Sequence, residues 1–138
     1  LVDCRRYNCN FLLNTGLRGN GSVNPMDACI LREIGKWVKR NQEAVYDVSA
    51  CDIKAENAII LQGEDFHYAI IKDVPMSADP NVQRVKSMGQ VCVDGKILSA
   101  EWLDNGEKIE LNDNAFSVSP FLYGESYFVR VAKLKMDI

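Results

Sequence analysis

Few residues in this chain have the types and spacing that chemistry requires. His67 is the only histidine among 138 residues, so a Ser–His–acid or Cys–His pair would have to use it. It lies in Phe66-His67-Tyr68, a stretch typical of a strand, where a position on a sheet face is the simpler interpretation. Carboxylate pairs such as Glu64-Asp65 fall in predicted turns, which favours solvated surface residues. These residues alone predict no catalytic centre.

The cysteines do not form a metal-binding pattern. No pair has Cys-x-x-Cys spacing, and a single histidine cannot complete the usual Cys/His zinc set. We therefore expect no metal site and no cofactor. The favoured interpretation is reduced cysteines that act as small hydrophobic residues, with one disulfide plus three free thiols as the alternative. The five are Cys4, Cys9, Cys29, Cys51 and Cys92.

Two further features could bind a ligand. The glycine-rich stretch from Gly16 to Gly21 joins a predicted strand to a predicted helix, as phosphate-binding loops do. It lacks the Gly-x-Gly-x-x-Gly register and a Gly-Lys-Ser/Thr ending, which favours a structural loop. Trp102 is either a core residue or a sugar-stacking platform. Tyr123 and Tyr127 are the other aromatic residues that a carbohydrate-binding surface could use.

The first third of the chain predicts a strand, a loop and a helix. Phe11–Leu13 is a short apolar run typical of a strand buried on both faces. Asn24 suits an N-cap and Pro25 the first helical position, so a helix is predicted from Pro25 to about Asn41. Its apolar stripe should pack on the following domain or on another chain, because leaving it in water is costly. The stripe comprises Ile30, Leu31, Ile34, Trp37 and Val38.

From about Asp47 the pattern indicates short strands separated by turns. Residues 58–62 and 66–72 predict a hairpin around Gly63-Glu64-Asp65, and Asp94-Gly95 predicts a second, tight hairpin. Asp104-Asn105-Gly106 predicts a further turn. The fold class is therefore mainly β, an antiparallel β-sandwich preceded by a strand–loop–helix unit. The remaining predicted strands are 82–88, 91–93, 97–103, 108–111 and 127–136.

Composition excludes several classes of protein. The formal net charge of −3 lacks the basic footprint of a nucleic-acid-binding protein. No apolar run approaches the roughly 20 residues of a membrane helix. The length is below the roughly 200 residues of the smallest complete TIM barrels. The chain begins with Leu1 and not Met, which we interpret as a cut or processed piece of a longer chain.

The N-terminal third resembles the α-L-fucosidase family of glycoside hydrolases. The family pattern runs L-(V/I)-D, then N-L-L-L-N-I-G, D-G-x-I, L-x-x-I-G-x-W-L and N-G-E-A-I-Y. Tyr68–Pro75 is similar to a further family segment, and the later strands agree by pattern only. The matching stretches here are Leu1–Asp3, Asn10–Gly16, Asn20–Val23, Leu31–Val38 and Asn41–Tyr46.

The resemblance implies a division of the chain. Residues 1–46 would be the terminal βα unit of a (β/α)8-type catalytic barrel, and residues 47–138 the C-terminal β-sandwich. The family is retaining, with an Asp nucleophile and a Glu acid/base. Neither maps onto this sequence, so this chain alone should not hydrolyse fucosides. Asn14, Leu17 and Arg18, beside Gly16, would lie near the barrel rim as candidate substrate-binding residues, because catalytic loops follow barrel strands.

The implied partners follow from that division. Fucosylated glycans would bind through the parent enzyme, the catalytic barrel would be the intramolecular partner, and the exposed helix stripe offers self-association. A secreted, a periplasmic and a cytoplasmic location remain open, given the odd number of cysteines. The alternatives to a fucosidase fragment are a non-catalytic carbohydrate-binding module and a purely structural β-sandwich.

Overall fold

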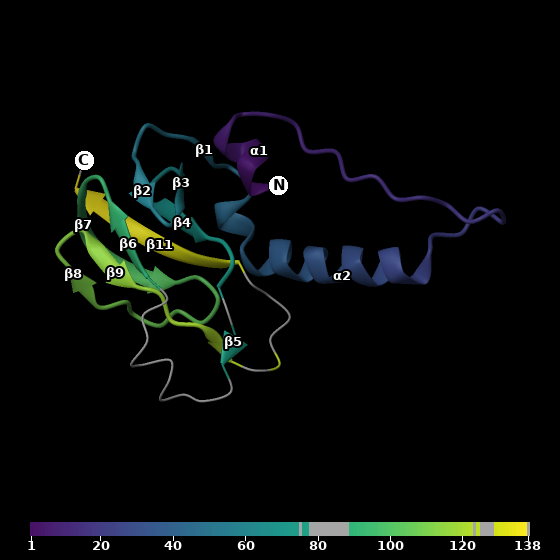
Figure 1. Cartoon of the computed structure of the whole chain (residues 1–138). Coiled ribbons are helices and arrows are strands. Elements are labelled where there is room, and N and C mark those ends of the chain that lie inside the picture. Colours follow the sequence, from purple (N-terminus) through teal and green to yellow (C-terminus); the bar gives the residue numbers. More distant parts are fainter. Residues whose placement is uncertain (75, 78–88, 123, 125–128, 138) are drawn as a thin grey trace.

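Two antiparallel sheets pack face to face and confirm the predicted mainly-β sandwich (Figure 1). The computed structural model describes residues 1–74, 76–77, 89–122, 124 and 129–137. One sheet has the order β1-β3-β4-β11-β7 and the other β2-β6-β9-β8. A parallel pair, β10 (Phe121–Leu122) with β5 (Met76–Ser77), lies apart from both. The strands of the larger sheet are β1 (Ser49–Ala50), β3 (Ile59–Gln62), β4 (His67–Ile71), β7 (Lys96–Trp102) and β11 (Arg130–Asp137); those of the smaller are β2 (Ala55–Glu56), β6 (Gln90–Val93), β8 (Leu111–Asn112) and β9 (Ala115–Ser117).

The larger sheet is covered on both faces, which explains its continuous apolar strands. Ala69 and Ile71 point into the core between the sheets, opposite Val91 and Phe116 of the smaller sheet. Successive side chains of a strand point to opposite faces, so the neighbours of Ala69 pack in a second cluster. That cluster lies under the N-terminal elements and contains Ala44, Val48, Ile59, Leu61, Tyr68, Ile70 and Val131.

A short helix that the sequence analysis did not predict opens the chain. This helix, α1 (Val2–Arg6), lies against β1 and β3 of the larger sheet. Its Arg5 Nε donates to the backbone oxygen of Val45, which precedes β1, at 2.8 Å. It ends in a left-handed residue, Asn8, with φ 52°. The Asn8 amide donates to Arg5 O at 3.1 Å and the Cys9 amide to Cys4 O at 2.7 Å. These two bonds form the Schellman motif that commonly ends helices.

The predicted strand at Phe11–Leu13 is not formed. Residues 9–16 belong to no strand, and the chain runs out from α1 and returns as the long helix α2 (Pro25–Arg40) (Figure 1). A strand needs partners for its backbone N–H and C=O groups, and the described chain provides none here. At the far end, Leu17 and Val23 form an isolated antiparallel bridge. We call residues 9–23 the N-terminal arm.

Helix α2 confirms its predicted caps but not its predicted packing. The Asn24 side chain accepts a hydrogen bond from the Met26 amide at 3.0 Å, and Pro25 is the first helical residue. No residue of α2 is buried, and Ile30 is 51% exposed. Only the C-terminal end of α2 reaches the sandwich, because the helix projects away from the sheets (Figure 1). None of the described helices is long and apolar enough to span a membrane.

The hairpin at Gly63–Asp65 is confirmed, and the one at Asp94-Gly95 is wrong. β3 pairs with β4 in the register Gln62↔His67. β6 and β7, on either side of Asp94-Gly95, belong to different sheets. Gly95 has φ 143°, and a Cβ there would lie 2.8 Å from Met136 Cε. Asp94-Gly95 therefore connects the smaller sheet to the larger one.

The other sequence predictions fall partly outside the described residues. β11 confirms the last strand from Arg130 onward, and Gly106 adopts φ 72° in the predicted turn. Of the predicted strand 108–111, only Leu111 lies in β8, while Lys108 forms an isolated bridge to Glu101. The predicted strand at 82–88, the aromatic residues Tyr123 and Tyr127, and the last residue of Tyr68–Pro75 lie outside the described part.

Candidate functional site

The three predicted rim residues all lie on the exposed N-terminal arm. Arg18 N donates to Ser22 O and Gly21 N to Arg18 O, each at 2.8 Å, so the tip is a tight turn beside Leu17. Gly21 has φ 80°, a conformation that glycine adopts readily. The structure thus brings Leu17 and Arg18 together at this tip, with Asn14 farther back along the arm.

A hydrogen bond holds the arm against the start of α2. Thr15 Oγ1 donates to Asp27 Oδ2 at 2.7 Å. The Asn20 side chain accepts from both N and Oγ of Ser22, at 3.1 and 2.7 Å, which shapes the turn. Local polar contacts therefore determine the shape of the arm, without any contribution from a buried core.

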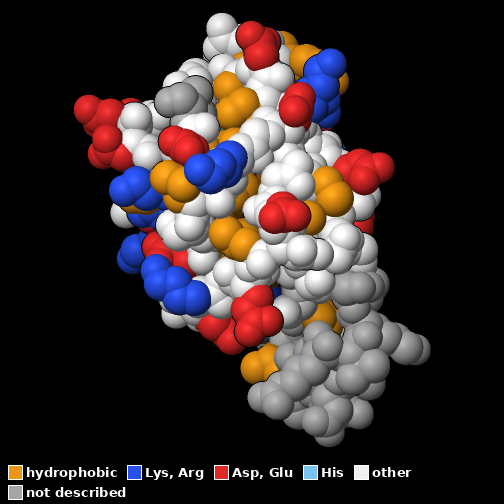
Figure 2. Space-filling view, turned by 90° about the vertical axis from the view of Figure 1, so that its left-hand side faces the viewer, with side chains coloured by type: hydrophobic (Ala, Val, Ile, Leu, Met, Phe, Trp, Pro, Cys, Tyr) orange, Lys and Arg blue, Asp and Glu red, His pale blue; other side chains and the backbone are white. Residues whose placement is uncertain are grey.

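The arm and α2 together expose many large apolar side chains. Leu12 is 81% exposed and Leu17 is 66% exposed. On the opposite side of the molecule, apolar side chains occur as small patches among charged residues (Figure 2). Soluble proteins rarely leave long apolar stretches in water, and such surfaces often mark interaction sites. We name this set the apolar arm surface; it comprises Phe11, Leu12, Leu13, Leu17, Val23, Met26, Ile30 and Ile34.

Polar contacts anchor the end of α2 and the following turn to the larger sheet. Trp37 Nε1 donates to Val129 O at 2.8 Å. Glu43, in the 3-10 helix η1 (Gln42–Ala44), accepts from Lys133 Nζ at 2.7 Å and from Tyr68 Oη at 3.0 Å. Burial and the nearby Glu43 carboxylate raise the pKa of the Tyr68 hydroxyl, so it stays protonated and continues to donate.

Trp102 is a core residue, which overturns its candidacy as a sugar-stacking platform. It is only 3% exposed, and its ring packs edge-on against Phe116 with centroids 6.1 Å apart. The Arg130 guanidinium carbon lies 4.0 Å from the Trp102 ring centroid. A sugar cannot reach a face that another side chain already covers.

Arg130 forms a buried ion pair with Asp104, which no local sequence pattern predicted. Its Nε and Nη2 donate to the two oxygens of Asp104 at 3.0 and 3.3 Å, and Nη1 donates to Ser119 O at 3.0 Å. The side chains of Arg130 and Asp104 are 7% and 13% exposed. The pair joins the predicted turn at Asp104 to β11, and it is structural because its donors and acceptors are engaged with one another.

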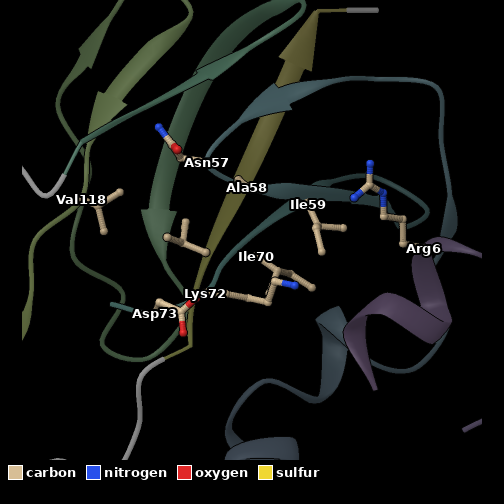
Figure 3. Close-up of a pocket in the computed structure, with 9 residues that line it drawn as sticks. Arg6, Asn57, Ala58, Ile59, Ile70, Lys72, Asp73 and Val118 are labelled. Atoms are coloured by element: carbon tan, nitrogen blue, oxygen red, sulfur yellow. The ribbon is translucent and has the colours of Figure 1, made fainter. Parts of the chain in front are cut away.

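A cavity of about 400 Å³ lies between α1 and the larger sheet (Figure 3). Arg6 reaches towards it from α1, and Asn57 and Val118 lie on the opposite side. Lys72 is part of its wall and pairs with Asp3, with Nζ to Oδ1 at 3.2 Å. The nine described lining residues include no aromatic ring, and Asp73 is their single carboxylate. This cavity lacks the paired carboxylates of a glycosidase.

His67 lies on a sheet strand, as its sequence context predicts. It is buried, and Nε2 has no hydrogen-bond partner among the described residues. Burial lowers the pKa of His67 below 6.5, so the ring is neutral at pH 7. Its position in β4 and its shared face with Ala69 make it part of the sandwich.

Comparisons with known proteins give matches to solved structures. No family model and no curated protein matches the sequence. The structure is similar to α-L-fucosidase isoenzyme 1 from Paenibacillus thiaminolyticus, with a TM-score of 0.73, 21% identity, and coverage of 99% of this chain and 33% of that chain. A GH29 α-L-fucosidase from Bacteroides thetaiotaomicron, trapped as a covalent intermediate, gives a TM-score of 0.72 at 22% identity, covering 99% and 31%.

A third similar structure has a lower sequence identity to this chain. The Thermotoga maritima α-fucosidase, solved with a mechanism-based inhibitor, gives a TM-score of 0.66 at 16% identity, covering 97% of this chain and 32% of that chain. This chain thus spans about a third of the length of these enzymes. These likenesses agree with the C-terminal portion that the sequence resemblance implies. The chain therefore has a fold that the GH29 α-L-fucosidases share.

Proposed function

We propose that this chain is the C-terminal portion of an α-L-fucosidase-like retaining glycoside hydrolase, and that it supports a catalytic barrel lying outside these residues. In this proposal, residues 1–46 complete the barrel and residues 47–138 form the sandwich beside it. The full-length parent hydrolyses α-L-fucosides, and fucosylated glycans reach it through the barrel.

The apolar arm surface carries this proposal. A barrel strand is buried on both faces, and Phe11–Leu13 has the apolar sequence of such a strand while lying exposed here. Burying one large apolar side chain contributes about 1.5–3 kcal/mol, so a covering partner would stabilise the arm and α2 strongly. A barrel that accepts Phe11–Leu13 as a strand would supply that cover.

The proposal assigns the chemistry to groups outside this chain. Retaining glycosidases use two carboxyl groups about 5–5.5 Å apart, one as nucleophile and one as acid/base. Asn14, Leu17 and Arg18 would then lie near the substrate at the barrel rim, because they follow the predicted barrel strand Phe11–Leu13 within the arm. Their role would be to shape the rim, since none can act as the carboxylate pair.

The parent reading frame provides the direct test. We expect the transcript upstream of the Leu1 codon to continue in frame and to encode an Asp and a Glu in the family's catalytic contexts. The protein expressed from that frame should hydrolyse a nitrophenyl α-L-fucoside, while the 138-residue chain alone should not. Turnover by the purified chain, lost when a carboxylate within it is changed, would contradict the proposal.

A second copy of the chain is the competing occupant of the apolar arm surface. Sedimentation of the longer protein with and without Ile34→Lys distinguishes a barrel from a second copy as the occupant. If the longer protein remains self-associated through α2, and Ile34→Lys dissociates it without loss of activity, the surface is an interface between copies and the proposed barrel contact is wrong.

A further inference from the structure

We infer that Cys4 and Cys9 form a reversible disulfide that locks the C-terminal cap of α1. The inference rests on the Schellman motif and on which residues occupy it. Cys4 is the third residue from the end of the helix, and Cys9 is the second residue beyond the cap residue Tyr7. In this motif the side chains at those two positions commonly touch.

The backbone hydrogen bond limits how far apart the two cysteines can be. Cys9 N lies 2.7 Å from Cys4 O. With standard bond lengths and angles, the two Cα atoms are at most about 6.6 Å apart. Disulfides span Cα separations of roughly 4.4–6.8 Å, so the existing backbone does not hold the two cysteines too far apart for a bond. The left-handed φ of Asn8 sets this geometry within the chain between the two cysteines.

The two thiols differ in access, which suits stepwise oxidation. Cys9 is exposed and its Sγ donates to Tyr7 O at 3.3 Å, so the sulfur turns back towards the helix end. Cys4 is half-buried. Cys51 is the other half-buried cysteine near α1 to be considered as a partner. Its Sγ donates to Ile60 O at 3.7 Å, so this thiol is turned towards the sheet.

The oxidant is a low-molecular-weight disulfide such as glutathione disulfide. The Cys9 thiolate attacks one sulfur of the oxidant, forming a mixed disulfide and releasing one thiol after protonation. The Cys4 thiolate then attacks Cys9 Sγ, closing the intramolecular bond and releasing the second thiol. Two protein thiols are oxidised and one disulfide is reduced to two thiols, so atoms and electrons balance.

The disulfide would hold fixed the direction in which the arm leaves α1. The Cys9 amide is the last one bonded back to the helix, and the arm begins at that residue. A covalent link at this point would reduce opening of the cap, because Cys9 could no longer separate from Cys4. This inference uses only residues of α1 and its cap, so it holds independently of the proposed function.

Two arginines between the cysteines make the test decisive. The purified 138-residue chain is equilibrated with glutathione disulfide, alkylated and digested with trypsin. Cleavage after Arg5 and Arg6 should leave peptides Leu1–Arg5 and Tyr7–Arg18 joined through Cys4 and Cys9. Glutathione disulfide can also cap the exposed Cys29, so thiols are counted in the Cys29→Ser variant, whose oxidised form should titrate two thiols fewer than its reduced form. Reduction should separate the linked peptides.

Matched serine variants complete the experiment. Cys29→Ser, at an exposed site on α2, should retain the linked peptides, while Cys9→Ser should lose them with an unchanged circular dichroism spectrum. Hydrogen exchange at the Asn8 and Cys9 amides should slow on oxidation in the original chain and in Cys29→Ser only. Stable glutathione on Cys9, or a bond from Cys4 or Cys9 to any other cysteine, would overturn the inference.

Discussion

Replacing Asp104 with Asn should destabilise the chain far more than the same replacement at Asp3. Both carboxylates pair with a cation at similar distances, 3.0 Å to Arg130 Nε and 3.2 Å to Lys72 Nζ. The environments differ, because the Asp104 side chain is 13% exposed and that of Asp3 is 57% exposed. The two variants therefore compare one chemical change at two levels of burial.

The expected loss of stability in Asp104→Asn follows from the Arg130 charge, which stays buried without its partner. Removing one partner of a buried ion pair typically costs about 3–5 kcal/mol, because the other charge remains uncompensated. An asparagine oxygen keeps one hydrogen bond to Arg130, so Asp104→Asn should lower the free energy of unfolding by about 3 kcal/mol. Exposed pairs contribute only about 0–1 kcal/mol, which is the range expected for Asp3→Asn.

Urea unfolding measures both values by linear extrapolation of the free energy of unfolding. For a chain of this length, a loss of about 3 kcal/mol corresponds to a fall in Tm of about 9–15 °C. The double variant Arg130→Met/Asp104→Leu should recover much of the loss, since an apolar pair leaves no charge unpaired. Equal losses in Asp104→Asn and Asp3→Asn, within about 0.5 kcal/mol, would refute the reasoning from burial.

Three further substitutions test the core, the histidine and the helix surface. Trp102→Ala should lower the free energy of unfolding by about 3–5 kcal/mol in urea titrations, and a near-neutral result would show that Trp102 is not core. Because burial lowers the pKa of His67, the unfolded chain binds a proton that the folded chain does not, so stability falls as the pH drops below 6.5. In His67→Leu, the thermal stability should fall less between about pH 7.5 and about pH 5 than it does in the original chain. An unchanged dependence of stability on pH would exclude His67 as its cause. Ile34→Lys should change the stability of the isolated chain by less than about 0.5 kcal/mol in urea titrations, and a larger loss would show that the stripe is packed.

Features with local causes were predictable from the sequence. Helix α2 begins where predicted, because the Asn24 cap and Pro25 act on adjacent backbone groups. The β3–β4 hairpin likewise depends on a short turn between two apolar runs. The α1 cap carried a weak local signal, since Asn8 is one of the residues that tolerate a left-handed conformation, but a helix of five residues has little periodicity to detect.

Features that depend on distant partners were not predictable. Asp94-Gly95 favours a tight turn, but the turn alone does not decide whether the following strand pairs with its predecessor or enters the other sheet. Phe11–Leu13 has the composition of a strand and lacks the neighbours that would make it one. Trp102 is buried by Arg130 and Phe116, and neither residue belongs to the local sequence around the tryptophan. In the candidate site, the rim residues were placed by resemblance, and the cavity near Arg6 had no sequence signal.

The position of β11 has a consequence for synthesis on the ribosome. This late strand, Arg130–Asp137, lies between β4 and β7 and pairs with both. Until those residues emerge from the exit tunnel, β4 and β7 each present an unpaired edge, and the larger sheet remains in two separate parts. Unpaired edges are prone to association with other chains. The larger sheet can therefore close only after Arg130–Asp137 has been made, and a ribosome that stalls shortly before the Arg130 codon would hold an aggregation-prone half-sheet.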